Sequence, residues 1–180
     1  MRTLSIPLAI AGILATTVLA SAEESEVRQE AETPHYHLVL LIGPNETVYT
    51  AAQARLERPS AGEIMLGGRV SGGIADIMPE AGGPARGATV RSSPDLHHLE
   101  LHVYSRATGR AVPEAHVTIA VTDGQRKRRS MPIARMYGVD EGPEDLHYGN
   151  NVILPPGAYT IETAINGEHA RFAVKVPEGS

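Results

Sequence analysis

Two alternating segments on either side of Asn166-Gly167 constrain the fold of this chain more than any other feature. In residues 158–165 and 170–176, apolar side chains recur at about every second position, which is the period of a strand with one buried face. An Asn-Gly pair between such segments favours a tight turn, because both residues tolerate the left-handed backbone that it requires. The C-terminal part of the chain therefore predicts an antiparallel hairpin.

Shorter segments of the same kind recur along the chain and end at turn-forming residues. Residues 98–104 alternate, with Leu99, Leu101 and Val103 on one face. Further strands are expected within 35–42, 61–70, 117–121, 132–137 and 151–154, a weaker one near 74–77, and a helical turn within 48–56. Short strands separated by turns at this spacing predict an all-β fold, an immunoglobulin-like antiparallel β-sandwich.

The N-terminal residues predict export. Arg2 precedes an apolar run over residues 6–20, and Ala20-Ser21-Ala22 is a small-residue cleavage site, as in a secretory signal peptide. We expect a signal peptide at 1–22, a flexible acidic leader at 23–33 and a single metal-binding β-sandwich domain at 34–178. The mature protein is then periplasmic or secreted, with no membrane insertion after cleavage.

Composition excludes several classes of function. The chain has no cysteine, so a metal site must use nitrogen, oxygen or thioether ligands. A formal net charge of −5 does not favour binding to nucleic acid. The basic run 126–129 is interpreted as a solvated hairpin loop, with a docking patch as the alternative. No hydrolase, nucleotide-binding or metalloprotease motif is present, and we expect that the protein is not an enzyme.

Histidines are the residues that point to metal chemistry, and the chain has eight of them. On a strand, His98, Glu100 and His102 share one face, with side chains roughly 7 Å apart; His35 and His37 also share a face. His147 lies between two glycine-containing turns, where a loop could aim it at the sheet. The alternative reading is that strand histidines are polar surface.

Methionines add soft thioether donors to this set. Met131 and Met136 are candidates, with Met65 and Met78 as further ones, although most methionines in such a chain fill the core. The candidate metal ligands are His147, His98, His102, Glu100, Met131 and His37.

A family resemblance rests on motifs that occur in order over residues 94–165. They are Met131-Pro132-Ile133-Ala134, then Asp145-Leu146-His147-Tyr148-Gly149-Asn150-Asn151-Val152, an earlier His98-Leu99-Glu100-Leu101-His102, and a later Gly157-Ala158-Tyr159-Thr160-Ile161. The chain thus resembles the bacterial periplasmic iron-transport proteins that accompany an inner-membrane iron permease and bind copper as well as iron.

The resemblance implies a periplasmic β-sandwich, often a homodimer, with a site of histidines, a methionine and a carboxylate. His147 matches the family's His-Tyr-Gly ligand. The histidine strand is two residues shorter here, so either His98 or His102 could take the family's ligand position. The family's methionine ligand lies in a setting that this chain lacks, and Met65, or His35 and His37, could substitute for it. Residues 138–145 form a longer, more acidic loop, which could close over the metal; we favour a simple insertion.

The leading hypothesis is a periplasmic protein that captures iron and/or copper and delivers it to an inner-membrane iron permease or related transporter. Metal binding should weaken as the pH falls through roughly 6.5, where histidines take up protons. The alternatives are a metal-free immunoglobulin-like interaction module of the cell envelope and a periplasmic copper chaperone.

Overall fold

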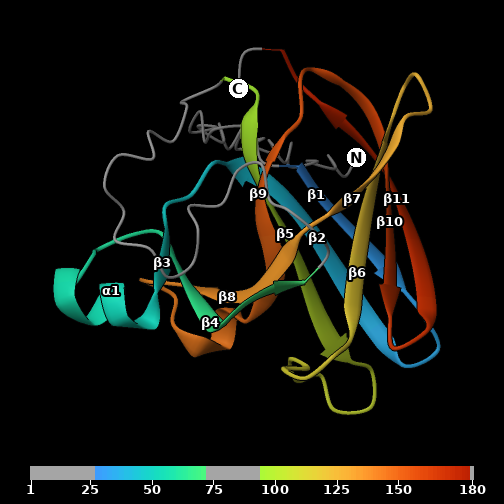
Figure 1. Ribbon diagram of the computed structural model, residues 1–180. Coiled ribbons are helices and arrows are strands. Elements are labelled where there is room, and N and C mark those ends of the chain that lie inside the picture. The colour runs from blue at the N-terminus through green and yellow to red at the C-terminus, as the bar shows by residue number, and fades with distance from the viewer. Residues whose placement is uncertain (1–26, 72–93, 179–180) are drawn as a thin grey trace, which may run out of the picture.

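Two β-sheets that face each other make up the described part of the chain (Figure 1). The computed structural model describes residues 27–71 and 94–178, so the predicted signal peptide at 1–22, the segment near 74–77 and Met78 lie outside the described residues. The elements are β1 Val27–Glu32, β2 Tyr36–Pro44, β3 Val48–Thr50, α1 Ala51–Glu57, β4 Glu63–Ser71, β5 Leu96–Ser105, β6 Val117–Asp123, β7 Arg128–Met131, β8 Ile133–Gly138, the 3-10 helix η1 Pro143–Asp145, β9 His147–Ile153, β10 Gly157–Ile165 and β11 Glu168–Val176.

The larger sheet has seven strands in the order β1-β2-β5-β9-β8-β4-β3, and the smaller has four in the order β11-β10-β6-β7. All neighbouring strands are antiparallel except β3 and β4, which are parallel. The predicted all-β sandwich is therefore confirmed. The hairpin predicted at Asn166-Gly167 joins β10 and β11, and both turn residues have positive φ angles.

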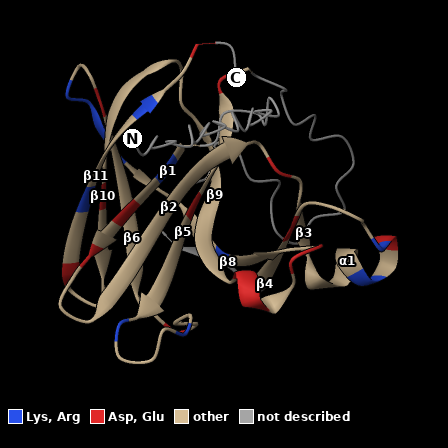
Figure 2. Cartoon of the chain, turned by 180° about the vertical axis from the view of Figure 1, so that it is seen from behind, with Lys and Arg blue, Asp and Glu red and all other residues tan. Residues whose placement is uncertain are grey.

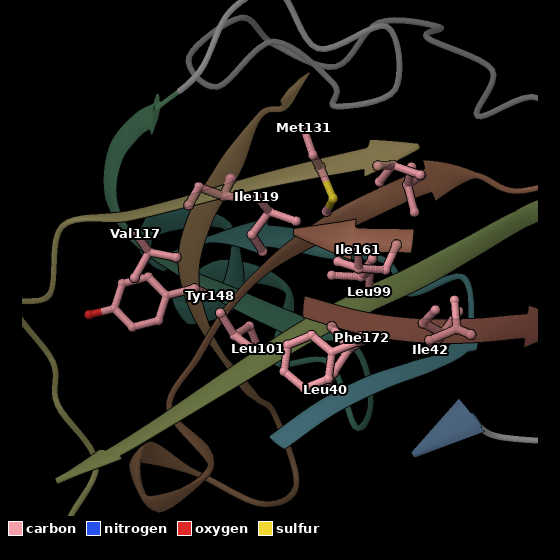
Figure 3. Close-up of a cluster of buried hydrophobic side chains, with 14 of the residues drawn as sticks. Leu40, Ile42, Leu99, Leu101, Val117, Ile119, Met131, Tyr148, Ile161 and Phe172 are labelled. Carbon is pink, nitrogen blue, oxygen red and sulfur yellow. The ribbon is translucent and has the colours of Figure 1, made fainter. Parts of the chain in front are cut away.

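The apolar core lies between the two sheets, and both contribute every second side chain to it (Figure 3). Leu99 and Leu101 point from β5 toward Ile161 of β10 and Phe172 of β11. Burying this core is the main favourable contribution to folding. Because side chains alternate along β5, the residues between these leucines lie on the opposite, outer face of the larger sheet.

A short helix follows β3 at the edge of the larger sheet. Thr50 caps its N-terminus: the side-chain oxygen accepts from the backbone N–H of Gln53, and the Gln53 side chain accepts from the backbone N–H of Thr50. Arg58 ends the helix in a left-handed conformation, with φ of 51°. The helical turn predicted within 48–56 is thus present, after three residues of strand. No helix of the described residues is long and apolar enough to cross a membrane.

Three local predictions were wrong. Residues 23–33 were expected to be a flexible leader, but they contain β1. Every residue of β1, 27–32, pairs with a residue of β2. The basic run 126–129 is exposed at the β6–β7 hairpin, but it is only half a loop, since β7 begins at Arg128. Arg128 donates to Glu162 Oε2 at 3.0 Å. His147 opens β9 and does not lie in a loop.

Candidate metal centre

The candidate centre lies on the outer face of the larger sheet, where β5 and β9 run side by side. His98, Glu100 and His102 alternate with core leucines along β5 and therefore share this face. Gly149 of β9 pairs with Glu100, which places His147, two residues earlier, on the same face. A Cβ atom at Gly149 would collide with the backbone of Leu99 and lie 3.3 Å from the Glu100 Cα. The missing side chain allows β9 to approach β5 closely.

A carboxylate reaches the same place from β4. Met136 of β8 pairs with His147 of β9, and Met65 of β4 pairs with Met136. These three residues therefore form one row across the sheet. Glu63 lies two residues before Met65, so it points to the same face. Its Oε2 atom is 3.4 Å from Nε2 of His147.

Four side chains thus form one compact cluster, called here the inner group: Glu63, His98, Glu100 and His147. One ligand atom of each lies within 4.8 Å of the others. His147 is 0% exposed, His98 1% and Glu63 5%. Buried charged residues are rare unless they are paired or bind a metal.

A cation fits this cluster because several of its buried atoms have no hydrogen-bond partner. Glu63 Oε2, His98 Nε2 and His147 Nε2 are all buried without a hydrogen bond, and the first and the last face each other at 3.4 Å. Leaving such atoms unsatisfied costs about 1–3 kcal/mol each. Two imidazole nitrogens and carboxylate oxygens, without a thiolate, are ligands that copper, zinc and iron accept. The donor set therefore fits a first-row transition-metal ion.

The tautomers of two histidines are set by hydrogen bonds away from the cluster. His98 Nδ1 donates to Asn151 Oδ1 at 2.9 Å, which leaves Nε2 with its lone pair free. His147 Nδ1 donates to the backbone oxygen of Asp145 at 2.9 Å, so its Nε2 carries the lone pair when the ring is neutral. Hydrogen bonds of this kind orient metal-binding histidines in many proteins.

Asn151 is itself held by the segment after β2. Its Oδ1 accepts from the backbone N–H of Glu46 at 3.1 Å, and its Nδ2 donates to the Glu46 oxygen at 2.7 Å. These two bonds fix which end of the amide faces His98. The orientation of His98 is thereby tied to the backbone of residues 44–47.

Burial and neighbouring charges shift the pKa values of the cluster in different directions. Burial opposes a charged His147 ring, but the hydrogen bond to Asp145 and the carboxylates of Glu100 and Glu63 outweigh it and raise its pKa to about 9. Burial raises the pKa of Glu63 to about 7, although His147 opposes the shift. Burial lowers the pKa of His98 to about 4. In the metal-free protein a proton on His147 supplies the positive charge that the carboxylates favour.

The structure brings together four of the six residues proposed from the sequence. His147, His98 and Glu100 belong to the inner group, and His102 lies beside it, with its ring centroid 5.3 Å from that of His147. His37 lies apart on the same sheet face, opposite Tyr104, and its Nε2 is 3.6 Å from a Glu30 carboxylate oxygen.

Met131 does not lie at the cluster, and its proposed role as a ligand was wrong. It is 4% exposed, pairs with Ile119 in the smaller sheet and packs in the core between the sheets (Figure 3). The methionine in register with His147 is Met136, five residues further along the chain. The chain passes to the larger sheet at Pro132, and Ile133 packs in the same core as Met131, whereas Met136, three residues after Ile133, lies on the outer face.

Two carboxylates at the centre were missed or undervalued from the sequence. Glu63 was not considered, although a charged residue opening an apolar strand was a usable signal. Asp145 lies in the acidic segment 138–145, which we favoured as a simple insertion; its Oδ2 is 3.3 Å from His147 Nδ1. This segment therefore borders the cluster. Figure 2 shows acidic residues, in red, beside β8 and β4.

Fold and site together define a β-sandwich protein with a buried imidazole–carboxylate cluster on the outer face of one sheet. No protein-family profile and no curated protein matches the chain. A solved structure that it resembles is FetP of uropathogenic Escherichia coli, in its as-isolated form after recombinant expression in the E. coli periplasm. The TM-score is 0.50 at 12% sequence identity, over 85% of this chain and 97% of that one. This likeness shows a shared fold.

Proposed function

We propose that this protein is a periplasmic carrier that captures iron and/or copper and delivers it to a membrane iron-uptake system. The observation that carries the proposal is the convergence of three buried ligand atoms that have no hydrogen bond: Glu63 Oε2, His98 Nε2 and His147 Nε2. A folded protein tolerates such atoms at a functional site when a ligand satisfies them. The ion would be held by the inner group as cargo.

Periplasmic location is supported by the signal-like sequence at 1–22 and by the fold shared with FetP, which was expressed in that compartment. The role of carrier, and not of enzyme, agrees with a site made of ligands alone and a chain without recognisable catalytic motifs. The partner in this proposal is an inner-membrane iron permease or a related transporter. Sequencing the N-terminus of the exported protein tests the first point, with a start at Glu23 expected.

Metal capture is tested by elemental analysis of the protein recovered from the periplasm, before and after incubation with Cu(II) or Fe(II). The His147→Ala and Glu63→Gln variants should lose bound metal, because each removes one of the converging atoms. The His169→Ala variant is the matched control, since His169 is exposed on β11, in the other sheet. Equal metal content in wild type and His147→Ala would overturn the proposal.

Delivery is tested separately by uptake of radioactive iron into cells that contain the permease. Uptake at limiting iron should increase with the wild-type chain and should not increase with His147→Ala. If the wild-type chain binds metal in vitro but does not increase uptake, the carrier role is wrong and only metal binding remains.

A further inference from the structure

One buried ligand atom near the centre is not used by the inner group. Nδ1 of His102 is buried and has no hydrogen-bond partner. The other nitrogen of this ring, Nε2, donates to Glu100 Oε2 at 3.1 Å. In the neutral ring, Nδ1 then carries the lone pair, which points away from Glu100. The side chain is only 6% exposed. Nδ1 needs a cation or a donor that the inner group does not provide.

The group facing this atom is the carboxylate of Asp145. Oδ1 of Asp145 lies 3.9 Å from His102 Nδ1, and Oδ2 lies 3.3 Å from His147 Nδ1. Asp145 ends η1, and the backbone N–H of Gly138 holds its Oδ2 at 3.0 Å. Two acceptors that face each other across 3.9 Å repel unless a positive charge lies between them.

His147 stands between this pair and the inner group. Its ring centroid is 5.7 Å from that of His98 on one side and 5.3 Å from that of His102 on the other. Nε2 faces Glu63, while Nδ1 faces Asp145. One ligand atom each from His102, Asp145 and His147 lie within 4.8 Å of one another.

The geometry points to a second position for a divalent transition-metal ion, formed by His102, Asp145 and His147 and called here the outer group. This inference rests on the proposed function, and it means that one chain holds two ions that share the His147 ring. Two imidazoles and one carboxylate are a ligand set that Fe(II), Cu(II) and Zn(II) accept. The outer ion is the more weakly held, since Asp145 is partly exposed and only three side chains hold the ion.

The two positions fill in order. His147 Nδ1 donates a hydrogen bond to the Asp145 backbone oxygen, so an ion at the outer group must displace that proton to solvent. A cation already bound at Nε2 makes the remaining N–H more acidic, because a bound metal ion changes the proton affinities around it. The inner group is therefore occupied first, and the outer group needs a higher concentration of free ion.

Titration of the mature wild-type chain with Cu(II) at pH 8, followed by calorimetry and elemental analysis after desalting, counts the positions. We expect two ions per chain, the second bound at least tenfold more weakly. Asp145→Asn and His102→Gln should each bind one ion, with the tighter affinity retained. Asp140→Asn, in the same acidic segment, is the matched control and should still bind two.

The same samples give a second readout that altered folding alone does not produce. Two Cu(II) ions bridged by the deprotonated ring, an imidazolate, couple magnetically, so the wild type should show fewer paramagnetic spins than copper atoms. Asp145→Asn should show one spin per copper. A wild type that binds one ion, or an Asp145→Asn variant that still binds two, overturns the outer group. A wild type that binds no ion at all overturns the proposed function itself.

Discussion

Oε2 of Glu63 lies 3.4 Å from Nε2 of His147, and neither atom has a hydrogen-bond partner. The two residues come from β4 and β9, which are separated in the sheet by β8. Their side chains meet because both point to the outer face from positions next to β8. This contact joins the N-terminal half of the chain to the histidine motifs of the second half, and it determines how metal binding depends on pH.

Metal affinity should keep rising with pH well above the ordinary range of histidine. The metal must displace the proton on His147, whose pKa is raised to about 9, and below about pH 7 also the proton on Glu63. His98, with its pKa lowered to about 4, adds no competing proton above pH 5. The logarithm of the affinity should change by about one per pH unit between 7 and 9 and by about two between 5 and 7. Competition with a chelator of known affinity measures this, and an affinity that levels off at about pH 7 would contradict it.

Asn151 should control the affinity of the inner group without binding the ion. In Asn151→Leu, His98 Nδ1 loses its acceptor, so the ring can turn or change tautomer and Nε2 is no longer presented to the site. We expect metal binding to weaken about 10- to 100-fold. Asn151→Asp keeps an acceptor for His98 and should restore part of the affinity.

NMR of the histidine ring nitrogens separates this positioning role from general damage to the fold. Wild type should show His98 protonated at Nδ1, and Asn151→Leu should show a mixture of tautomers. Gln125→Ala, in the exposed β6–β7 turn, is the control. An unchanged His98 signal together with full metal affinity in Asn151→Leu would exclude the role.

The sequence predicted the strands and one wall of the site, since both depend on local alternation. His98, Glu100 and His102 share a face because the strand period is two, whatever the partner strands are. Glu63 and Asp145 could not be placed in this way. Their positions depend on the strand order β9-β8-β4 and on the path of the segment before β9, which are long-range pairings that no local pattern contains.

Met131 shows that a sequence motif can also suggest a ligand that the long-range strand pairing places elsewhere. The motif resemblance directed attention to this methionine, yet the chain passes from the smaller to the larger sheet between β7 and β8, and Met131 remains in the core. Which of Met131 and Met136 faces the histidines depends on which sheet and which neighbouring strand each joins, and these are long-range pairings that the motif does not contain.

Substitution of Met131 should therefore affect stability and leave metal binding unchanged. Met131→Ala removes a buried side chain between the sheets and should lower the free energy of unfolding by about 2–5 kcal/mol. Met131→Leu, of similar volume, should cost less than about 1.5 kcal/mol. Urea unfolding measures both effects. Loss of metal from folded Met131→Leu would restore Met131 as a candidate ligand.

Gly149 should be the glycine to which the centre is most sensitive. In Gly149→Ala the new Cβ atom would meet the backbone of Leu99 and Glu100, so β9 must move away from β5 and carry His147 away from Glu100. Forcing a methyl group into such a place costs about 1–3 kcal/mol. Metal affinity should fall at least tenfold, because the ligands of the two strands separate.

Gly43→Ala is the matched control for this prediction. Gly43 pairs with His98 on the other side of β5, on the same sheet, but a Cβ atom there would have no heavy atom within 4 Å. Gly43→Ala should therefore keep wild-type stability within about 1 kcal/mol and bind metal normally. Chemical denaturation and Cu(II) titration of both variants test the pair. If Gly149→Ala bound metal as tightly as Gly43→Ala, the close approach of β9 to β5 would not be what assembles the site.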